Sequence, residues 1–270
     1  MDNIRLIAMD LDGTLLQRDG TLLPSAVQAL KRARERGITV AIASGRYPEN
    51  AALVFLDNGL DGPVIGINGA SVTDRAMGDC LFLHVMKDDT ARMTREILDK
   101  CGVDYLLFSH KLVTTSQEGL RHHSEISDGQ RIGRLGRVAF RHGQRAVDEA
   151  LEQGVCKYYV FNNGRLDQVA KALASVPCLT VTRSNPQNLE LMPQGVDKGS
   201  GIRELTRRLG IPLKNVMAFG DEDNDLPILT QVGFGVAMGN APEHVKNACR
   251  YVTAPFDEDG VGQAVIRYAL

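Results

Sequence analysis

The sequence lacks the long apolar segments that membrane and secreted proteins carry. No stretch approaches the roughly 20 consecutive apolar residues that a transmembrane helix needs. The first apolar run, residues 4–9, is short and ends at Asp10 and Asp12, which the apolar part of a signal peptide would not tolerate. We therefore expect a cytoplasmic protein that has no membrane partner.

Cysteine content and net charge are both low. The five cysteines among 270 residues are far apart and odd in number, and none forms a C-x-x-C pair. This argues against a disulfide framework or a zinc knuckle and suits a reducing compartment. The 31 basic and 33 acidic side chains leave a net charge of −2, so no overall field would attract nucleic acid. What remains is an ordinary globular composition, with enough length for one or two domains.

Strand and helix patterns alternate in the first and last thirds of the chain. In the first third, buried-strand runs and helical spacings alternate at residues 4–9, 24–37, 38–43, 48–58 and 64–67. The last third continues the alternation at residues 198–209, 216–219, 223–230, 234–236, 241–248, 251–252 and 261–270. Because strands that are apolar throughout are buried on both faces, this order predicts an α/β fold with a Rossmann-like parallel-sheet core.

The middle of the chain has a different pattern. Helices and strands are expected there at residues 88–100, 105–115 (two strands that can pair as a hairpin), 155–161, 166–173 and 179–182. We interpret residues 85–185 as an α+β domain inserted into a core formed by residues 1–84 and 186–270. Such an insertion costs little, because the entropy of loop closure grows slowly with loop length.

Asp10 and Asp12 directly follow the first apolar run. In an extended chain, residues i and i+2 point to the same side, so both carboxylates can face one pocket beyond the carboxyl end of the strand. Two adjacent carboxylates repel each other and need a cation, a shared proton or both. One can then act as nucleophile and metal ligand while the other transfers a proton. Gly13 allows a sharp bend, and Thr14 offers a hydroxyl ligand; a D-x-D-G surface turn is the alternative.

Ser44 and Lys198 are candidate ligands for an anion. Ser44 ends the second strand, and its hydroxyl with the backbone N–H groups that follow can form a small anion cradle. A helix N-cap serine is the alternative. Lys198 stands at the expected start of a helix, where the dipole disfavours a cation. A bound anion would explain it, and a solvated surface lysine is the alternative.

A second acidic cluster follows a later strand and comprises Asp221, Glu222, Asp223 and Asp225. Four carboxylates at one strand end repel one another unless a cation is present, and hard oxygen ligands select Mg²⁺ over zinc. The spacing is not that of an EF-hand loop. An acidic loop that caps the next helix is the alternative.

Together these features are the components of phosphoryl transfer: an anionic nucleophile, a divalent cation and donors for the phosphate oxygens. The motifs D-L-D-G-T-L at 10–15, A-S-G-R at 43–46, Lys198 and G-D-E-D-N-D at 220–225 resemble, in this order, the haloacid-dehalogenase (HAD) phosphatase superfamily. Three further stretches are similar to its Cof-like sugar-phosphatase subgroup: I-N-G-A at 67–70, L-E-L-M-P at 189–193 and M-G-N-A at 238–241. The resemblance covers the core, whereas the insert matches in position and rough size alone.

The resemblance implies a chemical role for each acidic motif. Asp10 would be the nucleophile that forms an aspartyl-phosphate, and Asp12 would be the general acid and base. Mg²⁺ would be held by the side chains of Asp10 and Asp221 and by the backbone carbonyl of Asp12.

The resemblance also implies how the substrate is held. Ser44, Gly45, Lys198 and Asn224 would bind the transferring phosphate, and Asp225 would orient its neighbours. The insert stands where this subgroup has a type-C2 cap, a domain that closes over the site and excludes water during the first transfer.

The insert contains an arginine-rich segment, residues 129–145, that carries five arginines and no acid. It can recognise a second anionic group of the substrate, bind nucleic acid, or form a solvated face balanced by Asp148, Glu149 and Glu152. We prefer the solvated face.

The function predicted from the sequence is Mg²⁺-dependent hydrolysis of small phosphomonoesters, sugar phosphates or related metabolites. A phosphomutase, which returns the phosphoryl group to the substrate, is the alternative with the same chemistry. A signalling receiver domain or a binding protein that uses an aspartyl-phosphate is the remaining alternative. Receivers are much shorter and carry the phosphoacceptor on a later strand than the acidic pair, which does not fit this sequence.

Overall fold

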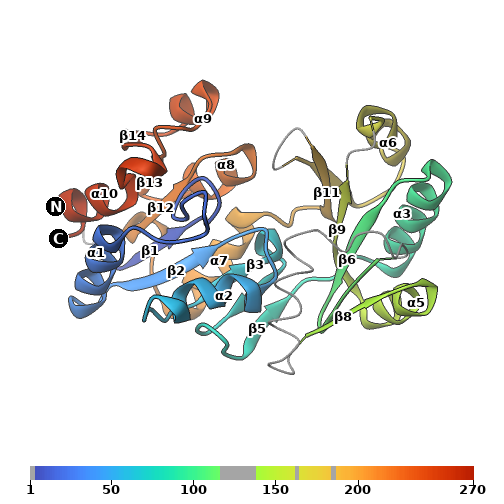
Figure 1. Cartoon of the computed structure of the whole chain (residues 1–270), viewed down its shortest axis with the longest axis horizontal. Coiled ribbons are helices and arrows are strands. Elements are labelled where there is room, and N and C mark those ends of the chain that lie inside the picture. Colours follow the sequence, from blue (N-terminus) through green and yellow to red (C-terminus); the bar gives the residue numbers. More distant parts are fainter. Residues whose placement is uncertain (1–3, 116–137, 162–163, 184–186) are drawn as a thin grey trace. The chain divides into compact units, whose positions relative to one another are not determined.

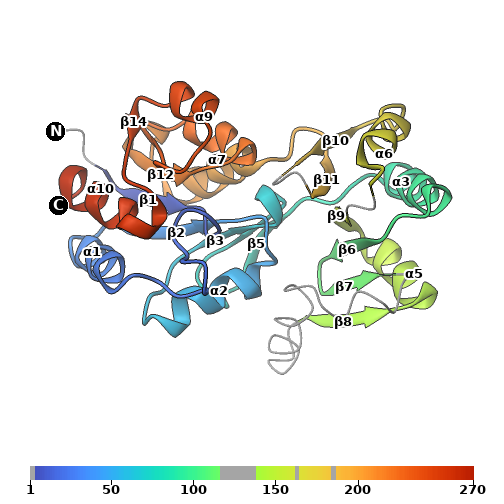
Figure 2. The ribbon, with the colours of Figure 1, turned by 45° about the horizontal axis from the view of Figure 1, so that its top comes forward.

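The structure of the protein is a computed structural model that describes residues 4–115, 138–161, 164–183 and 187–270. Within these ranges no helix is both long enough and apolar enough to cross a membrane. The ribbon is shown from two directions in Figures 1 and 2.

The chain divides into two compact units, which are described separately. The first comprises Met1–Phe82 and Asp197–Leu270, and the second comprises Leu83–Val196. These bounds differ from the expected boundaries after residues 84 and 185. The second boundary lies later because residues 188–193 form a strand that pairs within the sheet of the second unit.

The first unit contains an eight-stranded sheet with the order β14-β13-β12-β1-β2-β3-β4-β5. Its strands are β1 (Leu6–Met9), β2 (Thr39–Ala43), β3 (Val64–Gly66), β4 (Ser71–Thr73), β5 (Cys80–Leu83), β12 (Val216–Gly220), β13 (Phe234–Ala237) and β14 (Tyr251–Val252). From β14 to β3 all neighbours are parallel, and β4 pairs antiparallel with β3. Strand β1 lies between β2 and β12, where the strand order reverses. In open α/β sheets, ligands bind at such a reversal, beyond the carboxyl ends of the strands.

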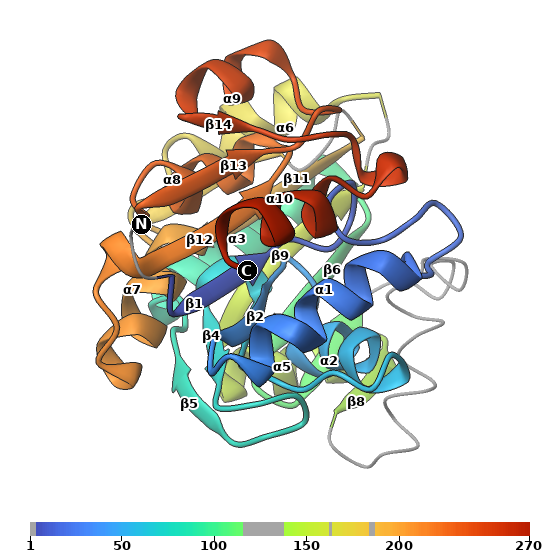
Figure 3. The ribbon, with the colours of Figure 1, turned by 90° about the vertical axis from the view of Figure 1, so that its left-hand side faces the viewer.

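Helices cover both faces of this sheet, as Figure 3 shows in an end-on view. They are α1 (Pro24–Glu35), α2 (Pro48–Asp57), α7 (Lys198–Leu209), α8 (Leu226–Leu229), α9 (Glu243–Ala248) and α10 (Gly260–Tyr268), with the short 3₁₀ turns η1 (Ile67–Gly69), η2 (Leu213–Asn215), η3 (Asp223–Asp225) and η4 (Phe256–Glu258). Helices α1, α2 and α10 share one apolar cluster with the sheet, and α7, α8 and α9 share another on the opposite face. The expected α/β fold with a parallel-sheet core is confirmed.

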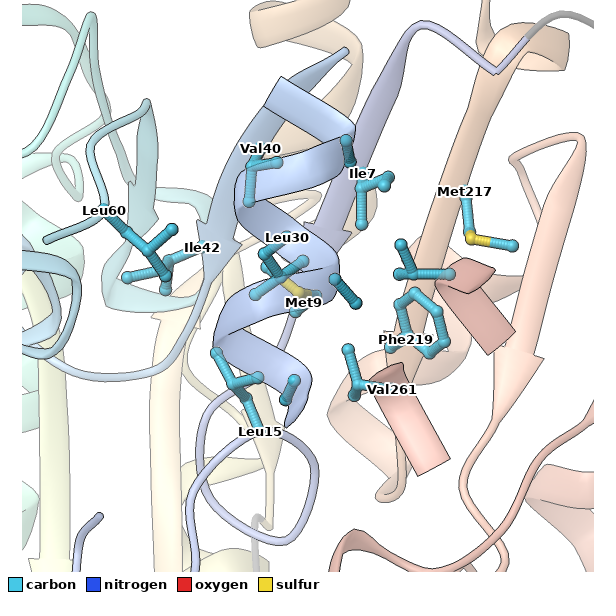
Figure 4. Close-up of a cluster of buried hydrophobic side chains, with 14 of the residues drawn as sticks. Ile7, Met9, Leu15, Leu30, Val40, Ile42, Leu60, Met217, Phe219 and Val261 are labelled. Carbon is cyan, nitrogen blue, oxygen red and sulfur yellow. The ribbon is translucent and has the colours of Figure 1, made fainter. Parts of the chain in front are cut away.

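Successive side chains of β1 point to opposite faces of the sheet, so this strand is buried on both faces. Ile7 and Met9 belong to the cluster beneath α1, whereas Leu6 and Ala8 belong to the opposite cluster. Figure 4 shows Leu30 of α1 beside Ile7 and Met9. Full burial of each large apolar side chain contributes about 1.5–3 kcal/mol. Packing on both faces therefore fixes the end of β1, and with it Asp10.

The second unit contains a six-stranded sheet with the order β10-β11-β9-β6-β7-β8. Its elements are β6 (Tyr105–Ser109), β7 (Leu112–Thr115), β8 (Ala139–His142), β9 (Val155–Phe161), β10 (Leu179–Thr182) and β11 (Asn188–Pro193), with α3 (Asp88–Cys101), α5 (Gln144–Gln153) and α6 (Leu166–Leu173). The helices share one apolar cluster with the sheet and run along one of its sides in Figure 2. The β6–β7 hairpin and the α+β character are as expected.

A buried ion pair lies within the sheet of the second unit. Lys157 of β9 and Glu190 of β11 are 2% and 3% exposed, and their Nζ and Oε1 atoms are 2.5 Å apart. The ammonium group also lies 5.3 Å from the centre of the Phe108 ring and 5.6 Å from that of Tyr159. Lys157 and Glu190 therefore form a structural ion pair inside this sheet.

Part of the arginine-rich segment is described. Helix α5 begins within it, at Gln144, and was not predicted, although Ala146, Val147, Ala150 and Leu151 have helical spacing and are buried. Arg141 of β8 pairs with Glu149 of α5 at 2.6 Å on an exposed face, which agrees with the solvated-face interpretation at that position. Arg131, Arg134 and Arg137 lie outside the described residues.

Candidate active site

The two acidic segments meet at one edge of the first unit's sheet. Strands β1 and β12 are parallel neighbours with Met9 opposite Phe219, and the Asp10 N–H donates to the Phe219 carbonyl at 3.1 Å. Asp10 and Asp221, each close to the end of its strand, therefore lie near each other at the same edge of the sheet. Carboxylate oxygens of Asp10, Asp221 and Asp225 lie within 4.8 Å of one another, and all three residues are buried.

Lys198 lies inside this cluster rather than on the surface. Its Nζ is 2.8 Å from Oδ1 of Asp10 and 2.6 Å from Oδ1 of Asp225. The side chain is 1% exposed, so the solvated-lysine alternative is wrong. Helix α7 begins at Lys198 because Asp197 caps it, accepting from the N–H of Ser200 at 2.7 Å. The cap places the lysine side chain at the carboxylates.

Asp225 is held by its other oxygen. Its Oδ2 accepts from the backbone N–H groups of Asp221 at 2.9 Å and Glu222 at 3.1 Å. A Cβ at Gly220 would lie 2.4 Å from Cβ of Asp225, so this close approach requires glycine at position 220. Both oxygens of Asp225 thus have protein partners, and the residue orients Lys198 and the backbone of Asp221.

The cluster carries more negative than positive charge. Burial raises the pKa of Asp10 well above its usual range; Lys198 opposes the shift, while Asp225 and Asp221 add to it. Burial likewise raises the pKa of Asp221 to about 7 against the opposing hydrogen bond from Thr14. For Lys198, burial acts to lower the pKa, but Asp10 and Asp225 outweigh it and raise the pKa. A cation between these carboxylates would relieve the repulsion.

The donor set fits Mg²⁺, which prefers carboxylate and carbonyl oxygens. Asp10, Asp221 and the carbonyl of Asp12 are the residues that could hold the ion. Gly13 gives the chain its turn here with φ +75°, and a Cβ in its place would lie 2.2 Å from Oδ2 of Asp221. Glycine therefore keeps the space beside Asp221 free of a side chain.

Thr14 contacts one of the acidic side chains. Its Oγ1 donates to Oδ1 of Asp221 at 2.7 Å, and the expected use of this hydroxyl as a ligand stays a prediction. The contact joins residues that are 207 positions apart in the sequence. Thr14 thereby orients a carboxylate, a role that no local sequence signal reveals.

Asn240 makes a second contact of this kind. Its Nδ2 donates to the Gly13 carbonyl at 2.9 Å and to Oδ2 of Asp221 at 3.2 Å. In the sequence, Asn240 stands out only as part of the M-G-N-A stretch, which predicts no contact. Its position three residues after the end of β13 (Phe234–Ala237), in the turn that leaves the sheet, is a further signal.

Asp12 points to a guanidinium group. Nε of Arg46 donates to its Oδ2 at 2.8 Å, and one terminal nitrogen donates to Oδ1 at 2.6 Å. The Asp12 side chain is 62% exposed, in contrast to the buried Asp10. The D-x-D pair therefore divides into one enclosed carboxylate and one accessible carboxylate that an arginine orients. No pattern in the sequence predicted this contact of Arg46.

Ser44 follows β2, the other neighbour of β1. It is 1% exposed; its N–H donates to the Ile65 carbonyl, and its Oγ accepts from the Arg46 N–H at 3.2 Å. The N-cap alternative is wrong, because α2 begins at Pro48 and Tyr47 occupies the cap position. Gly45, the other expected phosphate contact, is half-buried in the same turn.

Asn224 belongs to the 3₁₀ turn η3 that follows Asp221. Its Oδ1 is buried and has no hydrogen-bond partner among the described residues. A buried amide oxygen without a protein partner indicates a ligand or water at that place. The alternative reading of this acidic segment is realised as well, because Glu222 caps the turn in a capping box with Asp225.

Comparison with known proteins places these motifs in context. The family model described as haloacid dehalogenase-like hydrolase matches residues 7–265. A 5-amino-6-(5-phospho-D-ribitylamino)uracil phosphatase of Bacillus subtilis is 25% identical over 270 residues, which cover 99% of this chain and 97% of the relative. The pyridoxal phosphate phosphatase of Escherichia coli is 28% identical over 271 residues, covering 98% and 99%. A solved structure described as the HAD subclass IIB sugar phosphatase BT4131 has a TM-score of 0.81 at 26% identity and covers 98% of both chains.

Proposed function

The chain belongs to the haloacid dehalogenase-like hydrolases and is a phosphatase of that family, and from this premise we propose that it hydrolyses small phosphomonoesters with Mg²⁺ through an aspartyl-phosphate on Asp10. The observation that carries the proposal is the contact of Lys198 with Asp10 inside a cluster of buried carboxylates. A lysine beside the proposed nucleophile favours the charged form of its carboxylate against the effect of burial, and the surplus of carboxylates suits a divalent cation.

In the first step, a carboxylate oxygen of Asp10 attacks phosphorus while the bond from phosphorus to the leaving oxygen breaks. Asp12 donates a proton to that oxygen, and for this it must exchange its ion pair with Arg46 for contact with the leaving group. Lys198, Ser44, the backbone at Gly45 and Asn224 bind the phosphate oxygens. Donors fixed in advance around the phosphate stabilise the charge of the transition state.

In the second step, Asp12 takes a proton from water, whose oxygen attacks phosphorus. The bond between phosphorus and Asp10 breaks, which releases inorganic phosphate and restores both carboxyl groups. When bound by Asp10, Asp221 and the Asp12 carbonyl, Mg²⁺ supplies positive charge that offsets the carboxylates and the phosphate oxygens.

The substrate class we propose is a small phosphorylated metabolite. The named relatives act on a phosphoribitylaminouracil, on pyridoxal phosphate and on a sugar phosphate, so one phosphate on a compact polar group is the shared chemistry. We propose that the second unit acts as the cap and selects the leaving group, because the insert stands at the cap position along the chain.

The decisive experiment is a panel of phosphorylated metabolites assayed for released phosphate. We expect turnover with Mg²⁺, none with EDTA and recovery when Mg²⁺ is restored. Beryllofluoride should inhibit by occupying the phosphoryl position on Asp10, and substrate should protect against it. An isomeric sugar phosphate in place of free phosphate would instead identify a phosphomutase, and turnover without any divalent cation would overturn the role of Asp221.

A further inference from the structure

Asn240 belongs to the M-G-N-A stretch, a motif that the phosphoryl-transfer steps do not use. It follows β13, the second strand on the β12 side of β1. Two loops contact its side-chain nitrogen: the loop after β1, residues 10–14, here called the nucleophile loop, and the loop after β12, residues 221–225, here called the acidic loop. Nδ2 donates to the Gly13 carbonyl of the first at 2.9 Å and to Oδ2 of Asp221 of the second at 3.2 Å. One amide group thus connects three segments that are distant in sequence.

The network around Asn240 fixes the orientation of its amide. Nδ2 has two hydrogens and two acceptors, whereas Oδ1 accepts from the Phe256 N–H at 3.1 Å. A flipped amide would place its oxygen against the Gly13 carbonyl and the Asp221 carboxylate. Phe256 is itself held, because its carbonyl accepts from Nε2 of Gln17 at 2.8 Å. The segment between β14 and α10, which contains Phe256, therefore holds the amide in this orientation.

The two acceptors of Asn240 stand beside the proposed cation ligands. Gly13 directly follows Asp12, whose carbonyl is one of them, and Asp221 supplies another. Asp221 accepts from Thr14 on Oδ1 and from Asn240 on Oδ2. Both donors are neutral. They orient the carboxylate without cancelling its charge, whereas a lysine or arginine in the same place would compete with the cation.

We propose that Asn240 is a positioning residue that holds Asp221 and the nucleophile loop at the spacing required for Mg²⁺ before the ion binds. The inference rests on the metal site of the proposed function and adds a residue that supports it. Residues that orient metal ligands typically change metal affinity by about 10–100-fold when removed. We expect a loss in this range from a change at position 240.

The test compares Asn240→Ala and Asn240→Leu with Asn247→Ala, a change at another exposed asparagine on α9. Leucine keeps nearly the size and shape of asparagine but has no N–H group, which separates the loss of hydrogen bonds from the loss of packing. The readout is the melting temperature of the substrate-free protein across a MgCl₂ titration, because an ion that binds only the folded state stabilises it. Both variants at 240 should need at least about tenfold more Mg²⁺ for the same shift, and the control should match the unsubstituted protein.

A kinetic measurement separates positioning from catalysis. In the variants at position 240, the Mg²⁺ concentration for half-maximal phosphate release should rise by the same factor, while kcat at saturating Mg²⁺ should return to within about threefold of the original. Folded variants whose Mg²⁺ titrations superimpose on that of the unsubstituted protein would overturn the inference. If the unsubstituted protein showed no response to Mg²⁺, the metal site of the proposed function would fall, and this inference with it.

Discussion

The two units each contain a buried lysine, and the surroundings of the two lysines differ. Lys198 and Lys157 are 1% and 2% exposed. Lys157 lies in the middle of a sheet, paired with Glu190 and flanked by aromatic rings. Lys198 lies at the carboxyl ends of parallel strands, between two carboxylates and near a third. Burial of a charged side chain therefore does not by itself distinguish a structural site from a catalytic one.

Charge balance distinguishes the two sites. The Lys157–Glu190 pair joins one charge of each sign, so it is complete as an ion pair. In the first unit, one lysine faces the carboxylates of Asp10, Asp225 and Asp221, and burial has raised the pKa of Asp10 and of Asp221. That excess of negative charge costs stability in the metal-free protein. A cation that binds together with a phosphate ester would offset it. We therefore propose that Lys157 contributes to stability and that Lys198 takes part in the phosphoryl transfer.

The largest expected effect is that of Asp10→Asn. The variant should lose at least about 10⁴-fold in kcat, because an amide cannot form the phosphorylated intermediate. Its melting temperature without Mg²⁺ should not fall, since burial already disfavours the charged carboxylate that is removed. Phosphate release from an aryl phosphate and thermal unfolding measure the two properties. Substantial residual turnover would contradict the assignment of Asp10 as nucleophile.

Lys198→Met should lower kcat by about 10²–10³-fold, the usual cost of losing one fixed donor at a developing charge. The matched change in the second unit, Lys157→Met, should alter kcat by less than about tenfold, well below that cost. Steady-state kinetics at one saturating Mg²⁺ concentration, well below both melting temperatures, makes the comparison. If kcat fell equally in the two variants, charge balance would not distinguish a catalytic lysine from a structural one.

The change at Lys157, which should have little effect on kcat, should have a large effect on the stability of the second unit. Lys157→Met removes the ammonium group that pairs with the buried Glu190 carboxylate and should reduce the free energy of unfolding by about 3–5 kcal/mol. The double variant Lys157→Met/Glu190→Leu should recover most of that loss, because apolar groups of similar size replace a buried ion pair at little cost. Urea unfolding measures all three proteins. A double variant as unstable as the single one would mean that the ion pair has further structural roles.

The smallest effect concerns pH. Because the pKa of Asp221 in the metal-free protein is raised to about 7, protons compete with Mg²⁺ below that pH. The Mg²⁺ concentration for half-maximal activity should rise by about tenfold for each pH unit below 7 and level off above it. Activity assays at pH 6, 7 and 8 over a Mg²⁺ series measure this dependence. The same Mg²⁺ requirement at all three pH values would contradict the shifted pKa.

Much of the fold could be predicted from the sequence because its core strands are apolar throughout. Residues 4–9 and 38–43 read as buried strands, and parallel strands place their carboxyl ends at one edge. The short strands β4, β5 and β8 and helix α5 were missed. The expected boundary after residue 185 was wrong because β11 pairs with β9 and β10. This pairing depends on contacts between distant segments, which the local sequence pattern does not show.

The candidate site divides in the same way. Asp10, Asp12, Ser44, Lys198 and Asp221 could be singled out because each stands beside the end of a strand or at the start of a helix. The residues that orient them could not. Thr14, Arg46 and Asn240 act through contacts between distant segments, and a short polar side chain has many possible partners until the fold selects one.

The pairing of β1 with β12, Leu6 opposite Val216, has a consequence for synthesis on the ribosome. Asp10, the proposed nucleophile, is among the first residues to be synthesised, whereas Lys198 and Asp221 come only after the whole second unit. Until then one edge of β1 has no neighbour, and an open apolar edge favours association with other chains. A nascent chain that ends before residue 216 can therefore hold no assembled reaction centre, so activity begins only when the last third has folded back.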